Sequence, residues 1–139
     1  MKIMIIVAGF YEHISEMLIA GAVAECKKRG VEHDIVQVAG ALEIPPAIAM
    51  LESGEQEYDG YVALGCVIRG ETSHYETVCN ESARGLMDLG VRYHLAIGNG
   101  ILTVENETQA LERADISRKN KGAGAVNACL GLVELRNNN

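Results

Sequence analysis

The sequence has few large aromatic residues and little proline: no Trp, a single Phe and two Pro among 139 residues. Its core must therefore consist of aliphatic side chains, and the hydrophobic share of 48% is ordinary for a globular protein. No apolar run is long enough to span a membrane. The opening run ends at Ala8, which predicts a first strand and not a signal peptide. We expect residues 1–139 to form one domain with a substantial core.

Positive charge is also scarce. Twelve Lys and Arg residues stand against 19 Asp and Glu residues, for a formal net charge of −7. A nucleic-acid partner would require a basic stripe, and the sequence contains none, so we expect no such partner. Small anionic ligands remain possible because a few local cations suffice to bind them.

The cysteines lack the paired spacing of a metal or redox site. All four, Cys26, Cys66, Cys79 and Cys129, lie far apart without a C-x-x-C pair. A chain with this much core has little need of disulfides, so we expect reduced thiols in the cytoplasm, with two disulfides as the alternative. Cys66 lies in an apolar stretch and is expected to be inert packing.

Strand-like and helix-like patterns alternate four times along the chain, which predicts a parallel sheet in an α/β domain. The last quarter differs, because two helices follow each other without a strand between them. The expected strands are 2–8, 33–38, 61–68 and 93–97, and the expected helices are 14–29, 45–51, one from about residue 73 to 90, 106–113 and 123–136.

The segments that follow the four expected strands are 9–11, 40–43, 70–74 and 98–100. Open parallel sheets bind ligands beyond the carboxyl ends of their strands, so these segments should converge. They would bring together an aromatic ring, a carboxylate, an imidazole and an amide. This combination predicts a site for a small polar heterocycle and a phosphate.

The third strand and the helix after it carry the strongest local signal. Thr72 and Ser73 offer hydroxyls that can cap the helix, and His74 falls in its first turn. A helix that begins directly after a buried strand points its free backbone N–H groups beyond the sheet edge. We therefore expect an anion site there, with His74 beside it.

Five pieces of the sequence, in order and at matching spacing, resemble the lumazine synthase family. They are GALEIP at 40–45, LGCVIRGETSH at 64–74, TVEN at 103–106, ALER at 110–113 and NKG at 120–122. The resemblance implies a three-layer, flavodoxin-like α/β fold with strand order 2-1-3-4. It also implies condensation of 5-amino-6-ribitylaminouracil with 3,4-dihydroxy-2-butanone 4-phosphate, with release of phosphate and water. No metal and no organic cofactor is implied.

The resemblance also assigns roles to residues. His74 matches the proton-transfer residue, and Phe10 the aromatic on which the pyrimidine stacks. Arg113 and Lys121 match cations that reach into the pocket of a neighbouring subunit, so the family pattern implies a ring of five subunits. The remaining substrate-binding positions are the ribityl loop Ala41, Leu42 and Glu43, the strand end Val67 and Ile68, the phosphate loop Gly70, Glu71, Thr72 and Ser73, and Asn99 beside the ring.

Some positions depart from the family pattern. Gly9 stands where many members carry Arg, Leu42 where they carry an aromatic, and Ser117 where they often carry Lys. Glu71 should repel a phosphate unless its side chain points away.

Simpler interpretations stand beside these roles. Phe10 could belong to the core, Glu43 could serve the dipole of the next helix, and Arg113 and Lys121 could form a solvated face. Two other functions are also open: a carrier or shell protein that binds lumazine or flavin without catalysis, and an archaeal-type riboflavin synthase on the same scaffold.

We expect a free pentamer or a pair of pentamers, with a sixty-subunit shell as the alternative. The resemblance implies the smaller assembly at two places. Family members that form sixty-subunit shells generally carry an N-terminal extension, whereas the first strand here starts directly at the beginning of the sequence. Such members also often have a glycine between the last two helices, which the segment 117–120 lacks. Val126, Leu130 and Val133 on the last helix are expected to pack partly between subunits.

Overall fold

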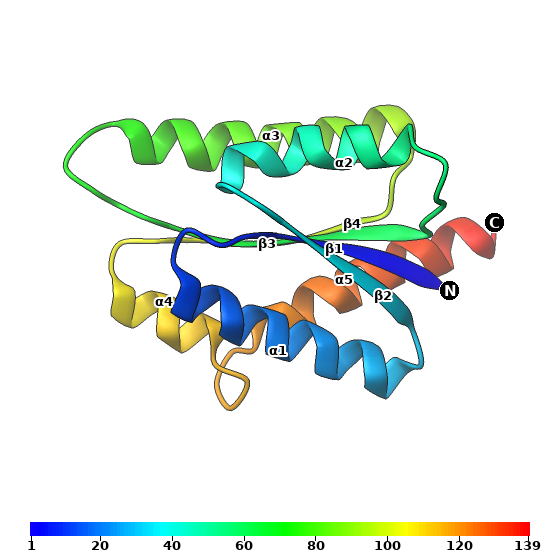
Figure 1. The fold of residues 1–139 in the computed structure, drawn as a ribbon, viewed down its shortest axis with the longest axis horizontal. Coiled ribbons are helices and arrows are strands. Elements are labelled where there is room, and N and C mark those ends of the chain that lie inside the picture. Colours follow the sequence, from blue (N-terminus) through cyan, green and yellow to red (C-terminus); the bar gives the residue numbers. More distant parts are fainter.

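A computed structural model describes all 139 residues as a four-stranded parallel sheet between two layers of helices (Figure 1). The strand order is β2-β1-β3-β4, which confirms the predicted fold class and order. The helices α2 and α3 cover one face, and α1, α4 and α5 cover the other. The strands are β1 (Lys2–Ala8), β2 (Glu32–Val38), β3 (Gly60–Ile68) and β4 (Ile97–Val104); the helices are α1 (Glu12–Arg29), the short 3-10 helix η1 (Ala41–Glu43), α2 (Ile44–Glu52), α3 (His74–Tyr93), α4 (Glu107–Ala114) and α5 (Lys121–Asn137).

The core lies on both faces of the two central strands, β1 and β3. Their side chains are buried on both sides, as expected for central strands of a parallel sheet. The larger cluster of 20 buried residues lies between the sheet and α1, α4 and α5, and a cluster of eight lies under α2 and α3. One stripe of α1, formed by Leu18, Ala22 and Cys26, is fully buried. Gly30 ends α1 with φ 68°, the left-handed conformation that glycine favours at this position.

The prediction for residues 90–100 was wrong. The helix α3 does not end at Gly90 but continues to Tyr93, where His94 ends it in the left-handed conformation. The fourth strand accordingly begins at Ile97, four residues later than predicted, and it includes Asn99.

Gly98 and Gly100, which were expected to follow the fourth strand, lie within it and have a packing role. A Cβ atom at Gly98 would clash with the carbonyl oxygen of Ala125 in α5, and one at Gly100 would lie 2.9 Å from the Ala125 Cβ. These glycines let α5 approach β4 closely. Two glycines close together in a sequence are compatible with a turn and also with a close contact between a strand and a helix.

The prediction for the last helix was also wrong in one respect. Val126, Leu130 and Val133 are at most 1% exposed within a single chain and belong to its own core. They cannot also pack between subunits. The exposed apolar residues of α5 are Leu132 and Leu135. None of the five helices combines the length and hydrophobicity needed to cross a membrane.

Candidate active site

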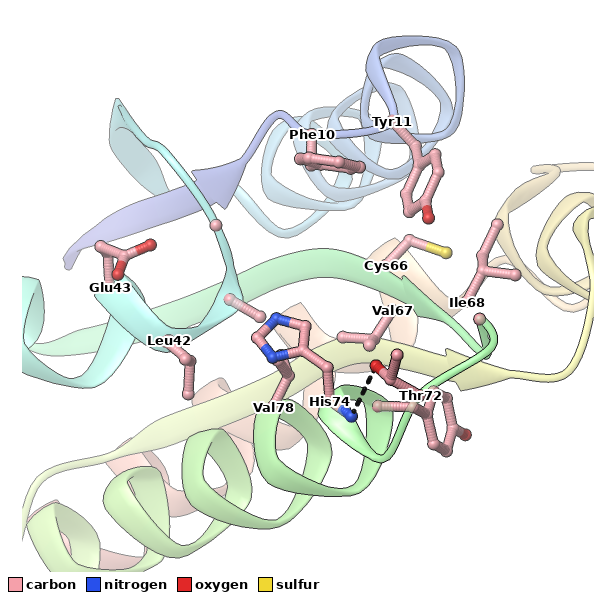
Figure 2. Close-up of a pocket in the computed structure, with 14 residues that line it drawn as sticks. Phe10, Tyr11, Leu42, Glu43, Cys66, Val67, Ile68, Thr72, His74 and Val78 are labelled. Atoms are coloured by element: carbon pink, nitrogen blue, oxygen red, sulfur yellow. Dashed lines mark hydrogen bonds between the residues drawn. The ribbon is translucent and has the colours of Figure 1, made fainter.

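A cavity of about 290 Å³ opens beyond the carboxyl ends of β1 and β3. Fourteen residues line it, and nine of these are hydrophobic. Figure 2 shows how they lie, with Phe10 and Tyr11 on one wall and the first turn of α3 on the other. The volume is just below the range of about 300–1,000 Å³ that is usual for ligand pockets. The predicted convergence of the loops after the first three strands is thus found.

Phe10 forms the rim of the cavity. It lies in the turn between β1 and α1, and its side chain is 74% exposed, which excludes a role in the core. Ser15 holds this turn, because its hydroxyl lies 3.0 Å from the carbonyl oxygens of both Ala8 and Tyr11. The Tyr11 ring packs edge-on against Phe10 with 4.9 Å between the ring centroids. Phe10 therefore presents an aromatic face to the cavity from a fixed backbone.

The wall opposite β3 is the single turn of η1. Gly40 precedes it in an extended conformation, and the backbone N–H of Glu43 donates to the Gly40 carbonyl at 3.1 Å. Ala41 is buried, Leu42 is half-buried and Glu43 is exposed. The turn thus offers an apolar surface that ends in a carboxylate (Figure 2).

His74 is the first residue of α3, and its imidazole points into the cavity (Figure 2). Its backbone N–H donates to the Thr72 hydroxyl at 3.2 Å, so a threonine side chain satisfies one of the free donors of the helix start. Ser73 was expected to cap this helix with its hydroxyl, but its side chain makes no such hydrogen bond. The positive end of the α3 dipole faces the same side as the imidazole.

The thiol of Cys66 lies inside the cavity and is expected to be unreactive near neutral pH. Burial raises the pKa of Cys66 to about 11, which keeps it protonated near neutral pH. A thiolate is the nucleophilic form of cysteine, so this thiol is a poor nucleophile. His74 is the only histidine among the residues that line the cavity.

Most of the site residues predicted from the sequence line this cavity, and five do not. Glu71 and Ser73 belong to the same loop but do not line the cavity. Asn99, Arg113 and Lys121 lie together in a second hollow beside β4. The Arg113 guanidinium there donates to the Gln109 carbonyl at 3.1 Å. Those that line the cavity are Phe10, Ala41, Leu42, Glu43, Val67, Ile68, Gly70, Thr72 and His74.

Five other residues line the cavity but were not among the predicted site residues, although Tyr11 and Gly40 belong to the segments that were expected to converge. Tyr11 follows Phe10 directly, and Cys66 precedes Val67, so proximity to predicted residues was the available signal. Tyr75 and Val78 were expected only to belong to the helix from about residue 73 to 90. The full set is Tyr11, Gly40, Cys66, Tyr75 and Val78.

Comparison with known proteins decides the family. The sequence model described as 6,7-dimethyl-8-ribityllumazine synthase matches residues 1–137. The chain belongs to the lumazine synthase family. Among its relatives, the 6,7-dimethyl-8-ribityllumazine synthase of Bartonella tribocorum is 57% identical over 96% of this chain and 89% of its own length. That of Novosphingobium aromaticivorans is 56% identical over 97% of this chain and 96% of its own length.

The proteins of the lumazine synthase family are transferases, and this chain is an enzyme of that class. No group of three or more His, Cys, Asp or Glu side chains is placed to hold a metal ion. All four cysteines are free thiols.

Proposed function

We propose that this chain condenses 5-amino-6-(D-ribitylamino)uracil with 3,4-dihydroxy-2-butanone 4-phosphate to form 6,7-dimethyl-8-ribityllumazine, with release of phosphate and water. This reaction belongs to riboflavin biosynthesis. The observation that carries the proposal is the position of His74, whose imidazole enters a mostly apolar cavity from the start of a helix. The free thiols are compatible with a cytoplasmic enzyme, which we also propose.

The pyrimidine substrate would occupy the side of the cavity formed by Phe10 and η1. The exposed ring of Phe10 offers a flat face for stacking, which is favourable for aromatic heterocycles. Val67 and Ile68 supply an apolar edge, and Glu43 offers oxygens to the hydroxyls of a ribityl chain. Ala41 and Leu42 lie between these groups.

The phosphate would lie against the loop formed by Gly70, Glu71, Thr72 and Ser73. This loop leads into the positive end of α3, a 20-residue helix, and such helix starts attract anions. Glu71 does not line the cavity, so its carboxylate need not oppose the phosphate. His74 is then close to both substrates and can donate and accept the protons of imine formation, phosphate loss and ring closure.

The second hollow supports a site shared between subunits. Asn99, Arg113 and Lys121 do not line the cavity of their own chain, and two of them are cations. If this hollow faces the cavity of a neighbour, it supplies the cations that the phosphate loop lacks. We propose a pentamer, or a multiple of it, in which each active site takes these residues from an adjacent subunit.

The proposal is tested by mixing the purified protein with both substrates and following the fluorescence of the lumazine product. We expect lumazine and phosphate to form together, and neither substrate alone to give fluorescence. Binding without turnover would indicate a carrier, and consumption of added lumazine would indicate a riboflavin synthase. Either result would overturn the proposal.

A further inference from the structure

Arg69 connects the parts of the chain that hold the phosphate loop. It follows β3 directly, and its backbone N–H donates to the Val104 carbonyl at the end of β4, at 3.0 Å. Its Nε donates to both carboxylate oxygens of Glu105, at 2.9 and 3.1 Å. Its Nη1 donates to Glu76 in the first turn of α3. One guanidinium thus joins the ends of two strands to the start of the helix that carries His74.

The same guanidinium lies over the ring of Tyr75, with its central carbon 4.3 Å from the ring centroid. Tyr75 lines the cavity directly after His74. Arg69 therefore contacts both residues that follow His74 in the sequence: the ring of Tyr75 and the carboxylate of Glu76. The hydrogen bond from Arg69 also holds the pKa of Glu76 below its usual range, so this carboxylate stays charged at neutral pH.

The loop between these anchors has little support of its own. From Gly70 to Ser73 the internal contacts are the Thr72 hydroxyl, which accepts from the His74 N–H, and the Ser73 carbonyl, which accepts from the N–H groups of Glu76 and Thr77. All four residues are exposed. Its conformation thus depends on where β3 ends and where α3 begins, and Arg69 sets the distance between these two points.

We infer that Arg69 is a positioning residue that holds the phosphate loop and the His74 imidazole in place through Glu105, Tyr75 and Glu76. Arg69 does not line the cavity, so this role is indirect. Arg69 also has an electrostatic effect. Its positive charge offsets the negative charges of Glu76 and Glu105 beside the loop that is proposed to bind the phosphate. The catalytic part of this inference rests on the proposed function, whereas the positioning part concerns the loop alone.

The test compares Arg69→Ala with Arg84→Ala. Arg84 is a matched control on α3: it also bonds two carboxylates, Glu81 at 2.8 Å and Asp88 at 3.0 Å, but it does not touch the loop. In Arg69→Ala we expect turnover to fall about tenfold to a hundredfold, the range for a small misplacement of a reacting group. The Michaelis constant for the butanone phosphate should rise, and that for the pyrimidine should change by less than about twofold. Arg84→Ala should resemble the wild type.

Two further measurements separate positioning from general damage. Guanidinium ion at millimolar concentration should restore part of the turnover of Arg69→Ala and leave Arg84→Ala unchanged. Hydrogen exchange followed by mass spectrometry should be faster in residues 70–77 of Arg69→Ala, with the rest of the chain unchanged. If Arg69→Ala does not fold, Glu105→Gln provides a milder variant. It removes the charge of one of the two carboxylates that Arg69 bonds and leaves the bond to Glu76 in place. It should change turnover, the Michaelis constants and the exchange of residues 70–77 in the same direction but by less.

The outcomes distinguish the two hypotheses. Unchanged exchange in 70–77, or an equal rise of both Michaelis constants, overturns the positioning role even if lumazine is formed. Faster exchange in a protein whose wild type forms no lumazine supports the positioning role and overturns the proposed function.

Discussion

At the scale of single residues, His74 is the side chain on which the proposed chemistry depends. His74→Ala should lower turnover while leaving pyrimidine binding nearly intact, because in the proposed site Phe10 and η1 hold the ring without the imidazole. One proton-transfer group typically contributes about a hundredfold or somewhat more. Steady-state rates and direct titration of the pyrimidine measure the two effects. Unchanged turnover would remove His74 from the mechanism.

A substitution of Arg113 tests whether the second hollow contributes to phosphate binding. Arg113→Ala should raise the Michaelis constant for the butanone phosphate and leave that for the pyrimidine unchanged, because in the proposed site only the phosphate contacts the guanidinium. Arg113→Lys should restore only part of the affinity, since Lys lacks the planar fork that binds two oxygens at once. Equal losses for both substrates would contradict a phosphate role.

At the scale of elements, the close contact between α1 and α5 depends on Gly122. A Cβ atom there would clash with the carbonyl oxygen of Leu18 in α1, which is backbone and cannot turn away. Gly122→Ala should therefore lower the free energy of unfolding by about 1–3 kcal/mol, the usual cost of overpacking. Thermal melting followed by circular dichroism, at equal protein concentrations, measures the change.

Gly131 on the same helix provides the control. A Cβ atom at Gly131 would meet no atom within 4 Å, and the residue lies on the exposed face of α5. Gly131→Ala should raise the free energy of unfolding by ~0.5–1 kcal/mol, because alanine loses less backbone entropy in a helix. Similar melting temperatures for the two variants would argue against the tight contact at Gly122.

At the scale of the whole molecule, a shared site predicts that two inactive variants complement each other. An oligomer that mixes His74→Ala and Arg113→Ala subunits contains some interfaces with an intact His74 on one side and an intact Arg113 on the other. Random mixing in equal amounts should restore about a quarter of the sites, since each interface needs one subunit of each kind in a defined order. Co-expression with two different affinity tags, followed by the lumazine assay, measures the recovery.

The mass of the particle provides the second test. Light scattering or sedimentation should give a multiple of five times the 15.0 kDa chain. Full activity at the mass of one chain would contradict the shared site. A sixty-subunit particle would leave the shared site intact and contradict only the expectation of a smaller assembly.

The local sequence alone determined the strands and helices whose periodicity and end signals agree. The strands β1 and β3 and the helix α1 appear within two residues of the ranges that the pattern predicts. It also placed His74 at the start of α3, because a buried strand followed by small and hydroxyl-bearing residues has few other conformations available. The signals for these features lie within each element and its flanking residues, so they can be recognised without knowing what the element packs against.

Only the tertiary structure decided the features that depend on contacts between distant segments. Gly98 and Gly100 could mark a turn or a close approach, and the packing of α5, some 25 residues later, settles which. Val126, Leu130 and Val133 could face a neighbour or the chain's own sheet, and the direction in which α5 crosses the sheet decides it. The bonds from Arg69 to Glu76 and Glu105 likewise require the ends of β3 and β4 and the start of α3 to meet. Periodicity reports which side of an element is apolar, and only the fold determines what that side packs against.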